Sequence, residues 1–384
     1  MTQPKRQPAP SLVLVLAMAV CIYTLQIENG GRLGAVLLPL VLLGQRRRFP
    51  AHSSPLMVLL PAWCLLSLAW NIAPAGSITT VVKVLSMLGC GWLMVRTQPW
   101  RRIGDVVSLG CTLFGLASLL AWVVSPATAW TPAGLNGVVT QNNSLGYGVA
   151  LGLTSVVLNA LVHGWRRVDL AMGAICLGTL VAANSMTSNI ATLVALATVG
   201  AGMAMRRVTA RTRALVLSVL VCTIGAAAFG LGQVSTTQLI GRDATLTGRT
   251  AFWPVLWELV TEHPLTGYGL GGPWAVGAWI RELMYQRFEF PLASAHNAIL
   301  ETLLQLGLIG LVIVVMLWLR AGLALVRSML RDDAGWWPAG IAIFSFVHGL
   351  AESAPEKTVA WLLFGLVCSF QGRRVLTTAS HAGR

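Results

Sequence analysis

The segment SAHNAILETLLQLGLIG, residues 294–310, opens an apolar run with a histidine and an amide. His296 and Asn297 come directly before a stretch that is typical of a membrane-spanning helix. An imidazole is largely neutral near pH 7, so at the mouth of such a helix it can accept a proton from a reacting group. We therefore predict that His296 is a general base. The alternative is that His296 only caps the start of the helix.

Three further ionisable side chains fall inside predicted apolar spans: Lys83, Glu301 and Glu352. Charged groups in hydrocarbon are costly and usually functional. On an ideal helix Glu301 shares a face with Asn297, whereas His296 points roughly 140° away from it. We expect Asn297, Glu301 and Glu352 to support the site. Lys83 is predicted to bind an anion, and the alternative for these charges is a structural Lys–Glu pair that joins helices.

Four arginines stand in the polar stretch 233–295: Arg242, Arg249, Arg281 and Arg287. The guanidinium group presents a planar fork of donors that fits phosphate oxygens. Arg249 begins a predicted helix in the sequence TGRT, and we rank it first as a phosphate ligand, ahead of Arg281 and Arg287. The competing interpretation for the last two is pairing with Glu282 and Glu289.

The composition defines the elements that must position these residues. Hydrophobic residues make up 55% of the 384 residues and charged residues only 10%, with a mean hydropathy of +0.72. This balance excludes a soluble globular domain, and only helices satisfy their own backbone across about 30 Å of hydrocarbon. We predict an all-α, polytopic membrane protein with about twelve transmembrane helices. The predicted spans are 11–27, 33–44, 56–71, 77–95, 103–124, 144–162, 168–184, 188–205, 214–232, 296–319, 336–352 and 358–371.

The basic residues sort to one side of this arrangement. With the N-terminus in the cytoplasm, 20 of the 27 Lys and Arg residues fall on the cytoplasmic side. They occupy the segments 5–6, 46–48, 96–102, 166–167, 206–213, 320–331 and 373–384. The formal charge of +14 is therefore a topology signal, and it predicts anionic membrane lipids as partners and no nucleic acid. Both termini are predicted to be cytoplasmic.

One loop is much longer than most of the others. Residues 233–295 form a predicted extracytoplasmic insert between the ninth and tenth spans, within a single domain of residues 1–384, and long loops in compact proteins are usually functional. The sequence RTAFWPVLWELVTEH predicts an amphipathic helix at the membrane interface. PLTGYGLGGP predicts a loop whose backbone could approach a ligand, and PWAVGAWIRELMYQRF predicts a second helix. A second outer loop, 125–143, ends in Asn142 and Asn143, which are further supporting candidates.

No residue pattern indicates a metal or another cofactor. The seven cysteines have no metal-ligand spacing, and they fall in or at the ends of predicted spans, where they pack as small hydrophobes. An Asp-x-Asp or other carboxylate cluster that would hold a divalent cation is also missing from the sequence. We expect the side chains to act without a metal.

Two motifs resemble a known family. His296, Asn297, Gly307 and Gly310 spell H-N-x9-G-x-x-G, which is similar to the signature of O-antigen ligases in the wider O-antigen ligase and polymerase family. The preceding TGRTAFWPVLWELVTEHPLTGYGLGG resembles the corresponding stretch of the exopolysaccharide polymerases of that family. The resemblance implies a metal-independent inner-membrane glycosyltransferase of the GT-C type. Such an enzyme moves a glycan from undecaprenyl pyrophosphate to an acceptor hydroxyl, with His296 as base and Arg249 on the pyrophosphate.

The resemblance leaves the acceptor open. The H-N-x9-G-x-x-G motif favours ligation to the lipid A core, whereas the TGR motif with a modest insert favours polymerisation onto a second glycan. Arg281, Arg287 and Lys83 are further candidates for the pyrophosphate. The alternative from a different functional class is that the protein is not an enzyme but a flippase or other transporter of lipid-linked glycans. It would predict charges along a path to the cytoplasmic half, but the predicted intramembrane charges gather at the outer, periplasmic side.

Overall fold

The computed structural model describes residues 56–205, 249–289, 292–330, 335–352 and 358–370, with a few isolated positions between 208 and 219. The predicted spans 11–27 and 33–44 lie outside the described residues, as does Arg242, and 214–232 lies almost entirely outside them. The regular elements of the described part are helices apart from one small hairpin, in which β1 (Trp130–Thr131) pairs antiparallel with β2 (Gly134–Leu135). The all-α prediction is therefore confirmed.

Five of the described helices are long and apolar enough to cross a membrane: α4 (Pro74–Thr97), α5 (Trp100–Val124), α7 (Asn142–His163), α9 (Met186–Ala204) and α14 (Ala298–Leu330). Shorter helices coincide with four more predicted spans: α3 (Leu56–Leu66) with the 3-10 turn η1 (Ser67–Trp70), α8 (Arg167–Ala183), α15 (Trp336–Ala351) and α16 (Thr358–Cys368). The chain is a multi-pass membrane protein, and the count of twelve spans stays a prediction.

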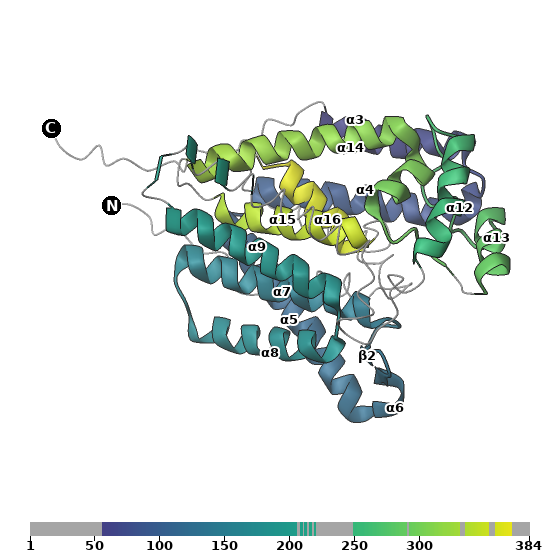
Figure 1. The fold of residues 1–384 in the computed structure, drawn as a ribbon. Coiled ribbons are helices and arrows are strands. Elements are labelled where there is room, and N and C mark those ends of the chain that lie inside the picture. The colour runs from purple at the N-terminus through teal and green to yellow at the C-terminus, as the bar shows by residue number, and fades with distance from the viewer. Residues whose placement is uncertain are drawn as a thin grey trace.

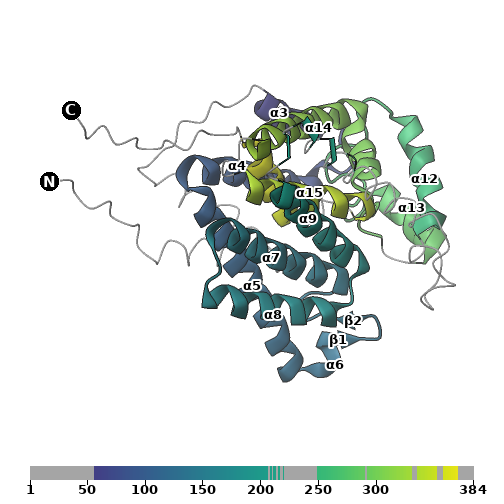
Figure 2. The ribbon, with the colours of Figure 1, turned by 60° about the vertical axis from the view of Figure 1, so that its left-hand side comes forward.

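The helices form two layers that α15 joins. Figures 1 and 2 show α3, α4, α14 and α16 on one side and α5, α7, α8 and α9 on the other. Small residues let the helices approach closely, as is usual in membranes. A Cβ built on Gly91 of α4 would lie 2.4 Å from the Leu362 carbonyl oxygen of α16, and one on Gly365 would lie 2.6 Å from that of Leu88.

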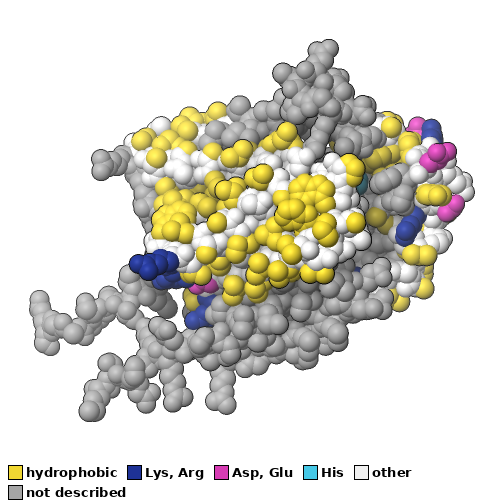
Figure 3. Space-filling model, turned by 90° about the horizontal axis from the view of Figure 1, so that it is seen from below, with side chains coloured by type: hydrophobic (Ala, Val, Ile, Leu, Met, Phe, Trp, Pro, Cys, Tyr) yellow, Lys and Arg dark blue, Asp and Glu magenta, His cyan; other side chains and the backbone are white. Residues whose placement is uncertain are grey.

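The two ends of the molecule differ in charge. Figure 3 shows mainly basic side chains at one end, a broad apolar flank, and both acidic and basic side chains at the other end. At the basic end Arg166, between α7 and α8, bonds to Asp105 and Asp169 at 2.7 Å each. These ion pairs tie α5 to α8 across the end of α7.

The long span α14 is broken at Gly307, where we predicted a continuous helix. Gly307 has φ 66° and ψ −171°, and a Cβ there would lie 2.2 Å from the Leu265 carbonyl oxygen. Only glycine fits this conformation and this approach. The freed backbone groups are satisfied, because Leu308 N–H donates to Pro264 O at 2.8 Å and Leu304 O accepts from Tyr268 N–H at 2.9 Å. Non-helical backbone within a span is tolerated where protein buries it.

The loop that fills this break is the glycine-rich segment 264–273. Its residues from Gly267 to Pro273 are buried. Trp70 donates from Nε1 to Thr266 O at 3.2 Å, and Gly269 lies so close to Asn71 that a Cβ would come within 2.6 Å of it. The glycines therefore let the loop approach α14 and the start of α4, where we had expected a ligand.

Two helices stand in the insert as predicted: α12 (Arg249–Glu262) and α13 (Trp279–Phe288). The second begins six residues later than expected, because Gly277 takes φ 80° in a series of turns. The apolar stripe of α12 packs inward, with Phe252 and Leu256 buried against α14, while Trp257 remains 55% exposed. The stripe that we assigned to the membrane interface is thus mostly a packing face.

Candidate active site

Asn297 is the residue that caps α14. Its Oδ1 accepts from Ile299 N–H and Leu300 N–H at 3.0 Å each, and its Nδ2 donates to Leu350 O of α15 at 3.3 Å. These bonds satisfy orphan donors at the helix start and tie it to the end of α15. Since Asn297 performs this task, the alternative of a capping role does not explain His296.

His296 pairs with a carboxylate from another span. Its Nδ1 lies 3.0 Å from Oε2 of Glu352, which follows the last residue of α15 and is 2% exposed. Oε1 of Glu352 accepts from Asn143 Nδ2 of α7 at 3.3 Å. A carboxylate oxygen only accepts, so the Nδ1 position carries a hydrogen, and in the neutral imidazole the lone pair is then on Nε2. Side chains from the start of α7 and from just before α14 thus meet at the carboxylate that follows α15.

The backbone of His296 is also constrained. Its φ of 49° lies in the left-handed region, which residues other than glycine adopt at a cost of about 1–2 kcal/mol. The preceding residue is held from both sides. Ala295 O accepts from Trp253 Nε1 of α12 at 2.9 Å, and Ala295 N–H donates to Glu301 Oε2. Such strain persists only where the surroundings fix it, and it is typical of functional positions.

Glu301 is the acceptor that joins this loop to the insert. It is fully buried, and its Oε1 accepts from Trp274 Nε1 at 2.6 Å and from Gln305 Nε2. Gln305 in turn accepts from Gly271 N–H at 2.6 Å through its Oε1. Glu301 therefore fixes the His296 loop relative to the glycine-rich loop, and its supporting role in the reaction stays a prediction.

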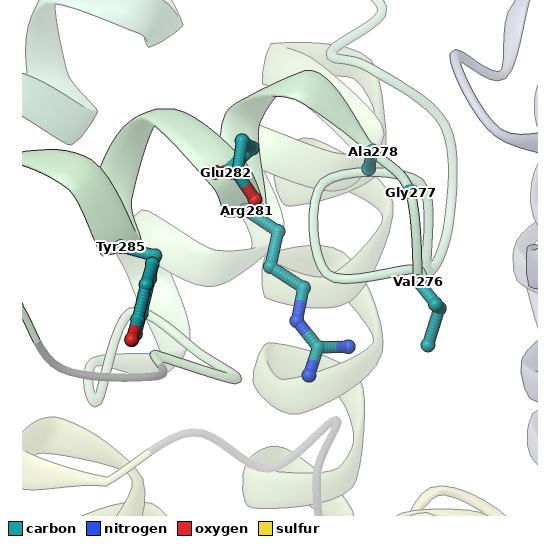
Figure 4. Close-up of a pocket in the computed structure, with 6 residues that line it drawn as sticks. All are labelled: Val276, Gly277, Ala278, Arg281, Glu282 and Tyr285. Carbon is teal, nitrogen blue, oxygen red and sulfur yellow. The ribbon is translucent and has the colours of Figure 1, made fainter.

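Arg281 lines a surface pocket of about 300 Å³ on α13 (Figure 4). Its Nη1 donates to Trp274 O at 3.2 Å, so it is linked through Trp274 to Glu301. In Figure 4 its guanidinium and the ring of Tyr285 extend to the same side of α13. Glu282 lines the same pocket and accepts from Gln286 Nε2, and no ion pair joins Glu282 to Arg281.

Known proteins resemble this chain in sequence. The family described as O-antigen ligase matches residues 171–315, which include His296, Glu301 and Gly307. The exopolysaccharide production protein ExoQ of Rhizobium meliloti is 28% identical over 370 residues, covering 90% of this chain and 84% of that protein. The chain is therefore similar to the O-antigen ligase family over residues 171–315 and to ExoQ over most of its length. Glu352 and Asn143 lie outside the matched segment, so only the fold brings them to His296.

The remaining residues that we predicted for the site lie in different places. Arg249 is the first residue of α12, one turn before Phe252, whose ring lies 6.3 Å from the His296 ring. Lys83 is half-buried in α4, nine residues from its start, and forms no hydrogen bond or ion pair with another described residue. The Lys–Glu pair considered as an alternative is thus not formed in the described part. Arg287 is exposed and forms no ion pair with Glu282 or Glu289, the partners considered for it.

Asn142 is not at the site. Its Nδ2 donates to Ala133 O at 3.2 Å and to Ala183 O at 3.0 Å, so it fastens the hairpin to the end of α8. The adjacent Asn143 points to Glu352 because successive residues on a helix face different directions. The two asparagines that the sequence presented as equivalent therefore have separate tasks.

Further polar side chains beyond the predicted set lie buried near the end of α15 or bond to the His296 loop. His348, one turn before Glu352 in α15, is buried against Tyr147 of α7, with ring centroids 4.6 Å apart. Its Nε2 lies 3.4 Å from Ser188 Oγ of α9. Trp253 and Trp274 were also missed as site residues, because a tryptophan in an apolar pattern gives no sign that its Nε1 will donate a hydrogen bond.

In the glycine-rich segment 264–273, burial and the Glu262 carboxylate raise the pKa of Tyr268, which donates to Glu262 at 2.7 Å.

Proposed function

We propose that this protein transfers a glycan from undecaprenyl pyrophosphate to an acceptor hydroxyl at the periplasmic face of the bacterial inner membrane. The observation that carries the proposal is the 3.0 Å contact between His296 Nδ1 and Glu352 Oε2 at the mouth of α14. A histidine held by a carboxylate is a common arrangement for a general base. The family supplies the substrate class, a lipid-linked glycan.

In the proposed reaction the acceptor oxygen attacks the anomeric carbon of the donor sugar. The bond from that carbon to the pyrophosphate oxygen breaks, and the acceptor proton passes to His296 Nε2. Glu352 stabilises the imidazolium that forms, because its Oε2 already receives the Nδ1 hydrogen. Asn143 holds the other carboxylate oxygen and so fixes the direction of the pair.

The leaving pyrophosphate needs cations, and we assign them to Arg249 and Lys83. Arg249 begins the helix whose next turn contacts the His296 loop through Phe252 and Trp253. Lys83 is a charge within a span that lacks a described partner, which is the situation in which a ligand is expected. Arg287 is too exposed to support this role, and the charge of Glu282 beside Arg281 disfavours an anion there.

The acceptor distinguishes two activities. The sequence motif favoured ligation to the lipid A core, whereas the likeness to an exopolysaccharide production protein over 90% of the chain favours polymerisation. We therefore infer that the acceptor is the glycan of a second lipid-linked molecule, and ligation is the second candidate. A transporter is disfavoured by the clustering of His296, Glu301 and Glu352 at one end of their helices.

The test is a transfer assay with purified protein in lipid nanodiscs. A labelled undecaprenyl-pyrophosphate glycan from the host is offered with two rival acceptors, lipid A core and a second unlabelled donor molecule. The proposal predicts products of increasing glycan length on the lipid-linked acceptor. Transfer to lipid A core alone would establish ligation, and no transfer from any lipid-pyrophosphate donor would refute the proposed function.

A further inference from the structure

We propose that the pocket on α13, lined by Val276, Gly277, Ala278, Arg281, Glu282 and Tyr285, is a saccharide subsite. It would hold a sugar unit of the glycan at a distance from the reacting end. This inference rests on the proposed function, because it assigns part of the same glycan to a second place on the insert. The reaction at His296 does not itself use any of these side chains.

The pocket has the shape and the exposure of a ligand site. Its volume of about 300 Å³ stands at the lower end of the range for small-molecule pockets. Val276 is 86% exposed, Tyr285 is 51% exposed, and a Cβ on Gly277 would meet no atom within 4 Å. The turn at Gly277 therefore leaves space beside an exposed aromatic ring.

The lining supplies the groups that a sugar requires. A pyranose ring presents an apolar face of C–H groups, which packs on an aromatic ring such as that of Tyr285. Its hydroxyls both donate and accept, so they are satisfied together by guanidinium N–H groups and a carboxylate. Arg281 and Glu282 stand one residue apart and provide this pair. Figure 4 shows Arg281 and Tyr285 extending on the same side of the helix.

Both polar side chains are held before any ligand arrives. Arg281 uses Nη1 to donate to Trp274 O at 3.2 Å, and Glu282 uses Oε1 to accept from Gln286 Nε2 at 3.0 Å. Each keeps further donor or acceptor positions for a ligand. Preorganised groups lose less entropy on binding than free ones.

The charge of the pocket favours a neutral ligand over the pyrophosphate. One guanidinium and one carboxylate line it, so their charges cancel, and an anion beside Arg281 would also face Glu282. This is why we reassign Arg281 from the pyrophosphate to the glycan. A bound sugar would belong to the glycan that reacts at His296, because Trp274 links Arg281 to Glu301 and hence to Ala295.

The experiment measures binding of the oligosaccharide that mild acid releases from the lipid-linked donors of the host. Saturation-transfer NMR is recorded on full-length protein in nanodiscs for the wild type, Tyr285→Ala and Arg281→Gln. Arg287→Gln is the matched control, since it makes the same substitution on the same helix at an exposed residue outside the pocket. We expect affinity to fall roughly tenfold in the first two variants and to stay unchanged in the control.

Three results would overturn the subsite: no oligosaccharide signal in the wild type, equal signals in wild type and Tyr285→Ala, or displacement of the oligosaccharide by inorganic pyrophosphate that requires Arg281. Transfer assays separate this proposal from the proposed function. Tyr285→Ala should raise the KM for long donors or long acceptors, measured in separate arms, while kcat on the shortest substrate is retained. Binding that persists in His296→Ala, which should not transfer, would support the subsite independently of catalysis.

Discussion

Replacement of Glu301 by glutamine is expected to impair transfer although it preserves size and shape. The Glu301 carboxylate accepts from three N–H donors, those of Trp274, Gln305 and Ala295. A glutamine has one oxygen and one NH2 group. If its oxygen faces Trp274 and Gln305, its NH2 faces the Ala295 N–H, and in the opposite orientation two donors lose their acceptor. Gln305 cannot rotate to help without losing its 2.6 Å bond from Gly271 N–H.

At least one buried donor is therefore left unsatisfied, which costs about 1–3 kcal/mol. Because the Ala295 donor directly precedes His296, we expect this cost to displace the base. If the whole cost of about 1–3 kcal/mol is added to the activation free energy, kcat falls roughly 5- to 150-fold. The assay is a single-turnover transfer rate in nanodiscs, with thermal unfolding measured on the same samples.

Glu262→Gln is the matched control, since that carboxylate accepts from the hydroxyl of Tyr268 and a glutamine oxygen can replace it. A wild-type rate in Glu301→Gln, with the control also at the wild-type rate, would refute the argument that Glu301 positions His296. A large loss of thermal stability in Glu301→Gln with an unchanged rate per folded molecule would likewise restrict Glu301 to helix packing.

Three further predictions follow from particular contacts. Gly307→Ala should lower the melting temperature, because for alanine a φ of 66° alone costs about 1–2 kcal/mol and the added Cβ would strike Leu265 O. The control is Gly200→Ala, which should not lower the melting temperature because a Cβ there would meet nothing within 4 Å. Equal melting temperatures in the two variants would contradict the role of the break. Asn143→Ala should lower kcat about tenfold through the loss of one hydrogen bond to the Glu352 carboxylate, while Asn142→Ala should keep kcat; the reverse pattern would refute the assignment. EDTA should leave the transfer rate unchanged, because the acids near His296 are already engaged by N–H donors, and a rate restored by added Mg²⁺ would contradict this.

The sequence predicted the helices better than it predicted which side chains contact one another. Apolar runs marked α4, α5, α7, α9 and α14, since a span must satisfy its own backbone wherever it packs. The H-N pair correctly marked the start of α14, but only the coordinates show that Asn297 caps the helix while His296 pairs with Glu352. Glu352 was singled out as a costly acid, yet its partner is 56 residues away, and nothing local identifies such a pair.

The break at Gly307 was hidden for a related reason. Its neighbours are all apolar, so the hydrophobic pattern continues through it, and only the segment 264–273 that enters the break explains why a glycine is required. The stripe of α12 shows the same limit. Periodicity defines an apolar face, but whether lipid or α14 covers that face depends on tertiary packing.

The most direct test of the central claim is the single-turnover transfer rate of His296→Ala, compared with His263→Ala, which replaces an exposed histidine of the preceding insert. Loss of a general base should lower the rate by about 10²- to 10⁴-fold, with expression and melting temperature retained and the control at the wild-type rate. A His296→Ala protein that folds normally and transfers glycan at a near-normal rate would contradict the account.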